Sequence, residues 1–186
     1  MGTDVQLIQQ HLQGDPQATR ALIERHQDLV YNLARRLLGD AEEARDAAQE
    51  TFLRALESLA GFRGDCTFST WLYRSAANTC IARSRQRRQR RSREVPAADR
   101  EPADESAPSS LDLVEQGERD EQLHQAVAEL AEPYRVVIAL HYFQQLTGAE
   151  VAQVLEVPEG TVKARLFRAQ RLLQRKLNPR GGRKIR

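Results

Sequence analysis

The residues best suited to chemistry in this sequence are aromatic rings followed by a run of arginines. The rings cluster where a helix is expected to start, near Thr67, and Ile81 to Arg93 contains seven arginines and no other charged residue. Bases stack on exposed rings, while a cationic track follows the phosphate backbone, for roughly 1–3 kcal/mol per stacked base. That is comparable to the few kcal/mol needed to unstack one. The pattern therefore favours single-stranded nucleic acid, although Phe68 and Trp71 could instead be core residues, and we expect at least one to be buried.

A second candidate site lies near the C-terminus, where two helical patterns are joined by a tight turn. Leu146 to Leu155 is a short amphipathic stretch in which Thr147 and Glu150 have capping-box spacing. A longer basic helix follows Pro158, and this arrangement is typical of a helix-turn-helix. At 100° per residue, five apolar side chains of the longer helix share one stripe. They are Val162, Leu166, Ala169, Leu173 and Leu177.

The opposite face of that basic helix is expected to be exposed and cationic. An exposed ring at Phe167 is explained if thymine methyl groups or sugars cover it, and nearby arginines could reach guanine edges. A good bidentate base contact contributes roughly 1–3 kcal/mol of discrimination. The alternative is an ordinary basic surface helix. The residues predicted to contact duplex DNA are Thr161, Lys163, Ala164, Arg165, Phe167, Arg168 and Arg171.

A third candidate is a small patch on the helix expected to begin at Asp40, which forms a capping pair with Glu43. The helical period predicts a buried stripe of Ala48, Phe52, Ala55 and Leu59. On the other side, an apolar anchor with a polar rim is typical of a protein-docking patch, although single surface leucines are common. The residues of this patch are Asp46, Gln49, Glu50 and Leu53.

Nothing in the sequence indicates a catalytic or metal site. His11, His26, His124 and His141 are scattered, and no nucleophile elbow or phosphate loop is present. Two cysteines, Cys66 and Cys80, leave a redox role open, but without a nearby histidine they make a weak metal site. No secretory signal or long apolar run is visible, so the expectation is a cytoplasmic protein without membrane insertion, cofactor or metal.

The elements that position these sites are all helical, because apolar spacing follows the helical period throughout. We expect an all-α protein with an N-terminal domain at residues 1–93, a linker at 94–117, a helix-turn-helix domain at 118–180 and a basic tail at 181–186. The linker is rich in proline, small and acidic residues, which predicts a flexible tether. Residues 94–121 carry ten acids against two arginines, whereas residues 159–186 carry ten basic residues against one acid. Two basic blocks separated by an acidic stretch indicate two nucleic-acid surfaces.

Three motifs together resemble the extracytoplasmic-function (ECF) sigma factors of bacterial RNA polymerase. Asp46 to Phe52 is similar to the polymerase-docking helix of that family. The segment from Phe62 through Trp71 to Thr79 resembles its −10 element reader, and Pro158 to Ala169 resembles its −35 recognition helix. The three occur in family order and cover nearly the whole chain, from about Asp15 to Leu177.

The resemblance implies partners and roles. The docking patch would bind the clamp coiled coil of the largest polymerase subunit, with the polymerase flap as a further contact, and an anti-sigma factor would be an additional partner. The helix-turn-helix would read the −35 duplex, and the aromatic segment would capture unpaired −10 bases. The residues implied for the −10 element are Phe62, Arg63, Phe68, Trp71, Arg74, Asn78 and Arg83.

Two departures and two alternatives accompany this interpretation. Ala164 stands where the family often has serine, and Glu156 stands where it often has glycine. A non-glycine residue in a left-handed conformation costs about 1–2 kcal/mol.

A conventional helix-turn-helix regulator would also bind duplex DNA, but it leaves the Asn78 helix and the Leu53 patch unexplained. An enzyme would require a site that the sequence does not contain.

Overall fold

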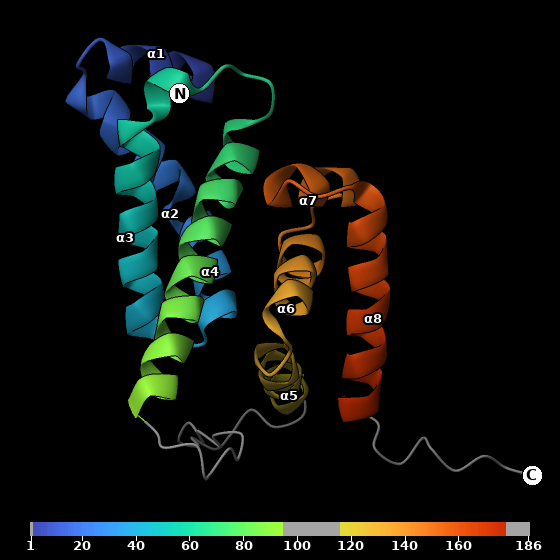
Figure 1. The fold of residues 1–186 in the computed structure, drawn as a ribbon. Helices are drawn as coiled ribbons and strands as arrows, with labels where there is room; N and C mark the ends of the chain where they lie inside the picture. The colour runs from blue at the N-terminus through green and yellow to red at the C-terminus, as the bar shows by residue number, and fades with distance from the viewer. Residues whose placement is uncertain (1, 95–115, 178–186) are drawn as a thin grey trace, which may run out of the picture.

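The computed structural model describes residues 2–94 and 116–177, and every regular element within these two ranges is helical (Figure 1). Of the expected linker at residues 94–117, residues 95–115 lie outside the described residues, as does the basic tail at 181–186. The ends of the expected linker are helical instead, since Glu94 belongs to α4 and Gln116 and Gly117 belong to α5. The elements in chain order are α1 (Asp4–Leu12), α2 (Pro16–Leu38), α3 (Ala41–Glu57), a 3-10 turn η1 (Leu59–Gly61), α4 (Phe68–Glu94), α5 (Gln116–Ala128), α6 (Glu132–Ile138), a π turn η2 (Ala139–Phe143), α7 (Gly148–Leu155) and α8 (Glu159–Leu177).

The first helices begin at side-chain caps that the sequence makes recognisable. Asp15 accepts a hydrogen bond from the Gln17 amide at 2.8 Å, with Pro16 in the first helical turn. Asp40 accepts from the amides of Glu42 and Glu43, both at 2.8 Å, and these bonds hold the pKa of its carboxyl below the ordinary value. Each cap satisfies amides that have no partner within the helix.

α2, α3 and α4 form a bundle with α1 lying across one end (Figure 1). Large aliphatic side chains, including Leu22 and Leu33 of α2 and Leu72 of α4, are fully buried between the three helices. Burying such a side chain stabilises the fold by about 1.5–3 kcal/mol.

The buried face of α3 differs from the predicted one. Of the predicted stripe, Ala55 and Leu59 are buried, but Ala48 and Phe52 are only half-buried. Small side chains face the bundle instead, because they let α3 approach its neighbours closely, and the larger Phe52 is displaced to the edge. The buried residues of α3 are Ala44, Ala47, Thr51 and Ala55.

The helices from α5 to α8 have a core of their own. Val127, Leu130 and Ile138 pack there against Ala169 and Leu173 of α8. The predicted stripe of α8 is largely confirmed: Val162, Ala169 and Leu173 are buried and Leu166 is half-buried. Leu177, in the last turn, is 40% exposed.

The two groups of helices also pack against one another. α7 lies beside α4 (Figure 1) and contacts it, while α5 and η2 contact α2. Val137, Leu140 and Val151 from the second group lie in the same continuous cluster of buried residues as Leu33 and Leu72 from the first. The all-α prediction is confirmed. The structure adds an apolar contact between the two groups of helices, which the sequence did not predict.

One exposed position has a strained backbone and is therefore suited to a stability test. Gln145 has a positive φ of 56°, which an L-residue adopts at a cost of about 1–2 kcal/mol. Gln145→Gly should raise the free energy of unfolding by about 0.5–1 kcal/mol, because the greater entropy of glycine in the unfolded chain offsets part of the relief. Urea unfolding followed by circular dichroism measures the change, and a lower midpoint would contradict the expected relief of strain.

Candidate nucleic-acid interface

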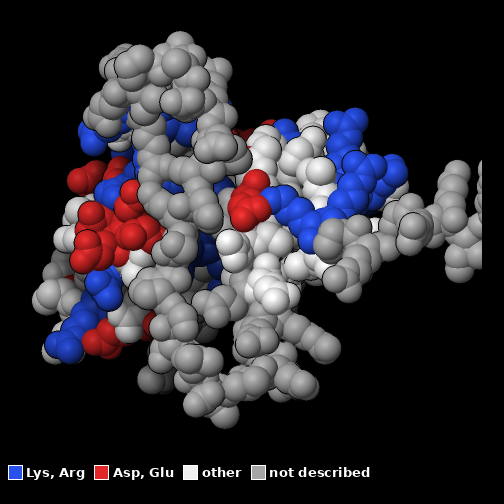
Figure 2. All heavy atoms as spheres, turned by 90° about the horizontal axis from the view of Figure 1, so that it is seen from below, with Lys and Arg blue, Asp and Glu red and all other residues white. Residues whose placement is uncertain are grey.

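The basic face of α8 is open to solvent in the part of the chain that the structure describes. Lys163, Ala164, Phe167, Arg168 and Arg171 are exposed, while Thr161 and Arg165 are half-buried. The Phe167 ring is 60% exposed and lies under the Arg171 guanidinium, 5.8 Å from its ring centroid. Figure 2 shows basic side chains gathered over the C-terminal helices, on the right of that view.

A groove of about 460 Å³ borders this face, between the start of α6 and α8. Tyr134 and Pro133 form one wall, and Arg165 and Arg168 lie on the other. Sequence reasoning missed the α6 wall, because nothing in the helical period of α6 indicates that its first turn lies beside α8.

The helix-turn-helix has the local geometry that its sequence predicts. Thr147 and Glu150 form a reciprocal capping box at the start of α7, and their hydrogen bonds lower the pKa of the Glu150 carboxyl. Glu156 ends α7 in the left-handed conformation, with φ 53°. α8 then starts at Glu159, whose carboxylate lies 3.0 Å from Lys163 Nζ.

The aromatic residues before and within α4 form one cluster. The Phe68 and Trp71 rings stack with centroids 5.7 Å apart, and Phe62 meets both edge-on, at 5.8 Å and 5.7 Å. Phe68 is only 5% exposed, which confirms that at least one of Phe68 and Trp71 is buried. Phe62 and Trp71 are half-buried, so they offer the accessible ring surface of this cluster.

One face of α4 carries an open strip beside that cluster. Trp71, Arg74, Asn78 and Arg85 fall within about 60° of one another at 100° per residue. All but the half-buried Trp71 are exposed, as is Arg63 in the preceding loop. This strip, defined by Trp71, Arg74, Asn78 and Arg85, combines an aromatic surface, a polar amide and two cations on one line.

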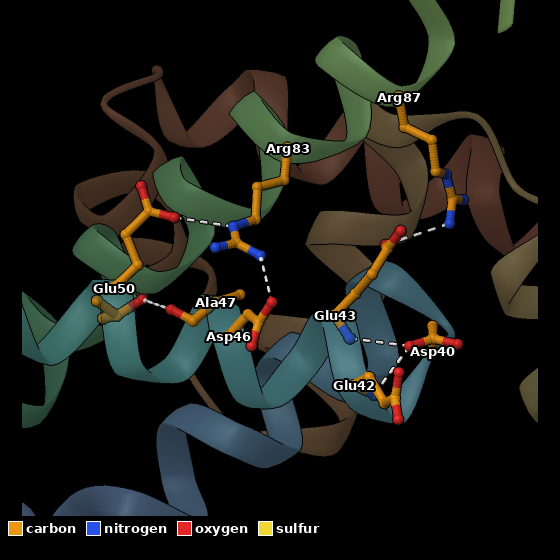
Figure 3. A network of polar contacts seen from close by, with 9 residues as sticks. Asp40, Glu42, Glu43, Asp46, Ala47, Glu50, Arg83 and Arg87 are labelled. Carbon is orange, nitrogen blue, oxygen red and sulfur yellow. Dashed lines mark hydrogen bonds and ion pairs between the residues drawn. The ribbon is translucent and has the colours of Figure 1, made fainter. Parts of the chain in front are cut away.

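Arg83 points away from the strip and toward α3. Its guanidinium lies 2.8 Å from Glu50 and 3.8 Å from Asp46 (Figure 3). One turn further along, Arg87 pairs with Glu43 at 3.2 Å (Figure 3). The structure thus places Arg83, which the resemblance implies as a −10 contact, together with two residues of the predicted docking patch.

The docking patch borders a groove of about 540 Å³ between α2 and α3. Leu53 is 56% exposed at its edge, and Phe52 and Leu56 contribute further apolar surface. Gln49 lies on the same groove, whereas Asp46 and Glu50 do not line it and pair instead with Arg83 of α4. The α2 wall is formed by Ile23, Gln27 and Tyr31.

Comparison with known proteins identifies this arrangement. The family models for Sigma-70 region 2 and Sigma-70 region 4 match residues 22–91 and 120–173. The RNA polymerase sigma-H factor of Pseudomonas aeruginosa is 35% identical, over 95% of this chain and 94% of its own length. The ECF RNA polymerase sigma factor SigW of Bacillus subtilis is 34% identical, over 91% of this chain and 94% of its own length.

The chain belongs to the sigma-70 family and is an ECF RNA polymerase sigma factor.

The fold of this sigma factor also matches solved structures. CnrH, solved in complex with the cytosolic domain of CnrY, superposes with a TM-score of 0.69 at 23% identity, over 96% of this chain and 99% of that one. RpoE of Bartonella quintana, solved with the anti-sigma factor NepR, has a TM-score of 0.66 at 21% identity, over 88% of this chain and 98% of that one. At these identities the likeness shows the fold.

Two features of the interface escaped sequence reasoning. The α2 wall of the docking groove was missed, although Ile23, Gln27 and Tyr31 recur at the four-residue spacing of one helix face. The pairing of arginines in α4 with acids in α3 was also missed, because the helices lie far apart in sequence and their register cannot be deduced from spacing.

Within residues 2–94 and 116–177, no group of three or more metal-ligating side chains comes together, and no helix is long and apolar enough to cross a membrane. Cys66 is half-buried and Cys80 is buried, both as free thiols.

The two thiols should react at very different rates. Burial raises the pKa of Cys80 to about 12, so only about one molecule in ten thousand carries the reactive thiolate there at pH 8. A thiol reagent such as DTNB should therefore label one cysteine quickly in the native protein and the second only in denaturant. Cys66→Ser should remove the fast phase, and two fast thiols in the native protein would contradict the burial of Cys80.

Proposed function

We propose that this sigma factor binds core RNA polymerase through the α2–α3 groove, reads the −35 duplex with α8, and captures unpaired −10 bases on the open strip of α4. The observation that carries the proposal is the placement of the groove and the strip on a single helical bundle. The groove lies between α2 and α3 and the strip lies on α4. Arg83, on another side of α4, pairs with Asp46 and Glu50 of the docking patch.

The groove has the composition of a docking site for a helical partner. Phe52, Leu53 and Leu56 supply apolar surface, and the polar lining comes from Gln27, Asp28, Arg45 and Gln49. Asp46 and Glu50 of the docking patch lie outside this lining, paired with Arg83 of α4. An interface of this kind derives most of its affinity from a few apolar anchors, and the polar lining provides orientation. The partner that the family resemblance gives for this surface is the clamp coiled coil of the largest polymerase subunit.

The strip on α4 suits a flipped base and its backbone. Trp71 and Phe62 present accessible ring surface, Asn78 can hydrogen-bond a base edge, and Arg74 and Arg63 can hold phosphates. Phe68 acts from underneath, by packing against Trp71 at 5.7 Å, and so positions the ring rather than contacting DNA.

The face of α8 suits the major groove of duplex DNA. Lys163, Arg165 and Arg168 can reach bases or phosphates, and Phe167 can cover thymine methyl groups. Each half alone offers little surface, so the polymerase must align both. The linker then adds the two affinities through effective concentration. Binding to free DNA should accordingly be weak and sensitive to salt.

The remaining properties follow from this role. The protein performs no bond chemistry itself, and it acts in the cytoplasm, where polymerase and promoters meet. An anti-sigma factor is a further partner by analogy with CnrH and RpoE, whose structures were solved with such proteins or domains.

A conventional helix-turn-helix regulator is the second candidate function. Such a protein would bind duplex DNA specifically without polymerase and would make no use of the groove.

Leu53→Asp should weaken binding to core polymerase by about ten-fold or more, because it places a charge on the apolar anchor of the groove. Fluorescence anisotropy with labelled protein and purified core enzyme measures the affinity. Leu12→Asp is a matched control, since Leu12 is similarly exposed at 53% but lies on α1. Equal affinities for the two variants, with both folded by circular dichroism, would remove the docking role.

Asn78→Ala should reduce promoter opening by about ten-fold, since one base-directed hydrogen-bonding group contributes roughly 1–3 kcal/mol. Permanganate reactivity of −10 thymines in the holoenzyme measures opening, and affinity for core polymerase should stay unchanged. Asn32→Ala, at an exposed position of α2, is the control. Wild-type reactivity in Asn78→Ala would show that the base is captured elsewhere.

A further inference from the structure

α1 is attached to α2 at both of its ends. Near the start, Asp4 Oδ1 accepts a hydrogen bond from the Arg25 guanidinium at 2.7 Å, and the same guanidinium donates to the Gly2 carbonyl at 2.9 Å. Near the end, His11 Nδ1 lies 2.6 Å from Thr19 Oγ1. Apolar side chains in the middle of α1 belong to the core of the bundle. The helix is therefore an ordered part of the N-terminal half, yet none of the roles proposed above depends on it.

The second carboxylate oxygen of Asp4 faces a buried histidine. His26 is 5% exposed, and its Nε2 atom lies 3.2 Å from Asp4 Oδ2. In α2 it occupies the buried stripe between Leu22 and Val30, at four-residue spacing. An apolar side chain would fill this place unaided, whereas a buried imidazole nitrogen requires a polar neighbour. The Asp4 carboxylate supplies that neighbour, although the contact is not aligned as a hydrogen bond.

The same imidazole contacts the aromatic cluster at the start of α4. The rings of His26 and Phe68 meet edge-to-face, with centroids 5.2 Å apart and an interplanar angle of 77°. Phe68 in turn stacks on Trp71 at 5.7 Å, and Trp71 belongs to the open strip. Aromatic pairs have preferred geometries, so each ring restricts the orientation of the next. A continuous line of contacts thus leads from Asp4 of α1 through His26 and Phe68 to Trp71.

α1 also borders this cluster from a second direction. It contacts η1, and the residue that follows η1 is Phe62, whose ring meets both Phe68 and Trp71 edge-on. A base stacks well only on a ring that is held in one orientation, because the ring must present its face to the base. The contacts of α1 therefore bear on the part of the strip where orientation matters most.

We propose that α1 is part of the −10 reader, with Asp4 and His26 as positioning residues for Trp71. Asp4 holds the imidazole of His26, His26 holds Phe68, and Phe68 supports the Trp71 ring at the angle at which an unpaired base stacks on it. Neither Asp4 nor His26 contacts DNA. The proposal rests on the single-strand role given to the strip above. The alternative is that Asp4 and His26 only attach α1 to the bundle.

The first test uses Trp71 as its own reporter, since it is the only tryptophan in the sequence. Asp4→Ala should move the Trp71 emission to longer wavelength and increase its quenching by acrylamide, because the ring is less firmly packed. In the holoenzyme, permanganate reactivity of −10 thymines should fall by about three- to ten-fold, a part of what the stacking of one base contributes. Affinity for core polymerase should stay unchanged.

Thr19→Val is the matched control for this variant. It removes the polar contact at the other end of α1 and leaves Asp4 and His26 in place. If the two residues only attach α1 to the bundle, Asp4→Ala and Thr19→Val should behave alike. The proposal requires changes in both Trp71 fluorescence and promoter opening for Asp4→Ala and neither change for Thr19→Val, and it fails otherwise.

The second test asks whether Asp4 acts through His26. His26→Phe keeps a ring against Phe68 and removes the nitrogen that needs a polar neighbour. In this background Asp4→Ala should leave Trp71 emission and promoter opening unchanged. The four proteins form a double-mutant cycle, which isolates the coupling between the two residues. The same effect of Asp4→Ala in both backgrounds would show that Asp4 acts independently of His26, and the proposal would be wrong.

Trp71→Ala separates this inference from the proposed function. If Trp71→Ala reduces promoter opening while Asp4→Ala does not, the positioning role alone is lost and the single-strand role of the strip stands. If Trp71→Ala itself opens the promoter normally, the base is stacked elsewhere. In that case the proposed role of the Trp71 ring is lost together with the reason for positioning it.

Discussion

The structure depends on one constraint, which is that α4 must be a core helix and a nucleic-acid surface at the same time. Its apolar side chains, such as Leu72 and Ala76, are buried against α2 and α3. A further side receives α7, and the strip of Trp71, Arg74, Asn78 and Arg85 lies on the remaining exposed surface. The packing of α4 therefore decides which of its side chains remain accessible to a ligand.

The arginines of α4 contact different partners. Arg83 and Arg87 are paired with carboxylates of α3 and stiffen the bundle (Figure 3). Arg74 and Arg85 pair with carboxylates of the C-terminal half. The difference lies in their angular position on the helix, since Arg83 and Arg87 point toward α3, whereas Arg74 and Arg85 lie on the side of α4 that borders the C-terminal helices. A run of seven arginines is thus not one uniform track.

Much of the fold follows from local signals, whereas its long-range contacts do not. Caps at Asp15, Asp40 and Thr147 and the period of α8 identify the helices, because each depends on residues within one or two turns. The buried face of α3 was predicted only in part: Ala55 and Leu59 are buried, but Ala48 and Phe52 are half-buried, because smaller residues allow closer approach. The roles of Leu53, Asn78 and Phe167 remain predictions, but their exposure is consistent with them. The pairing of Glu156 with Arg74 spans 82 positions, and no local pattern indicates it.

Glu156 shows why such a contact matters for reading the sequence. Considered alone, it is a departure from glycine that costs local strain. Considered with Arg74, the same residue gains an ion-pair partner across the contact between the two halves, whereas the strain belongs to the local backbone at the end of α7. An exposed ion pair contributes at most about 1 kcal/mol, which is no more than the strain. The ion pair therefore offsets the strain at most, and the local stability of α7 alone would favour glycine at this position.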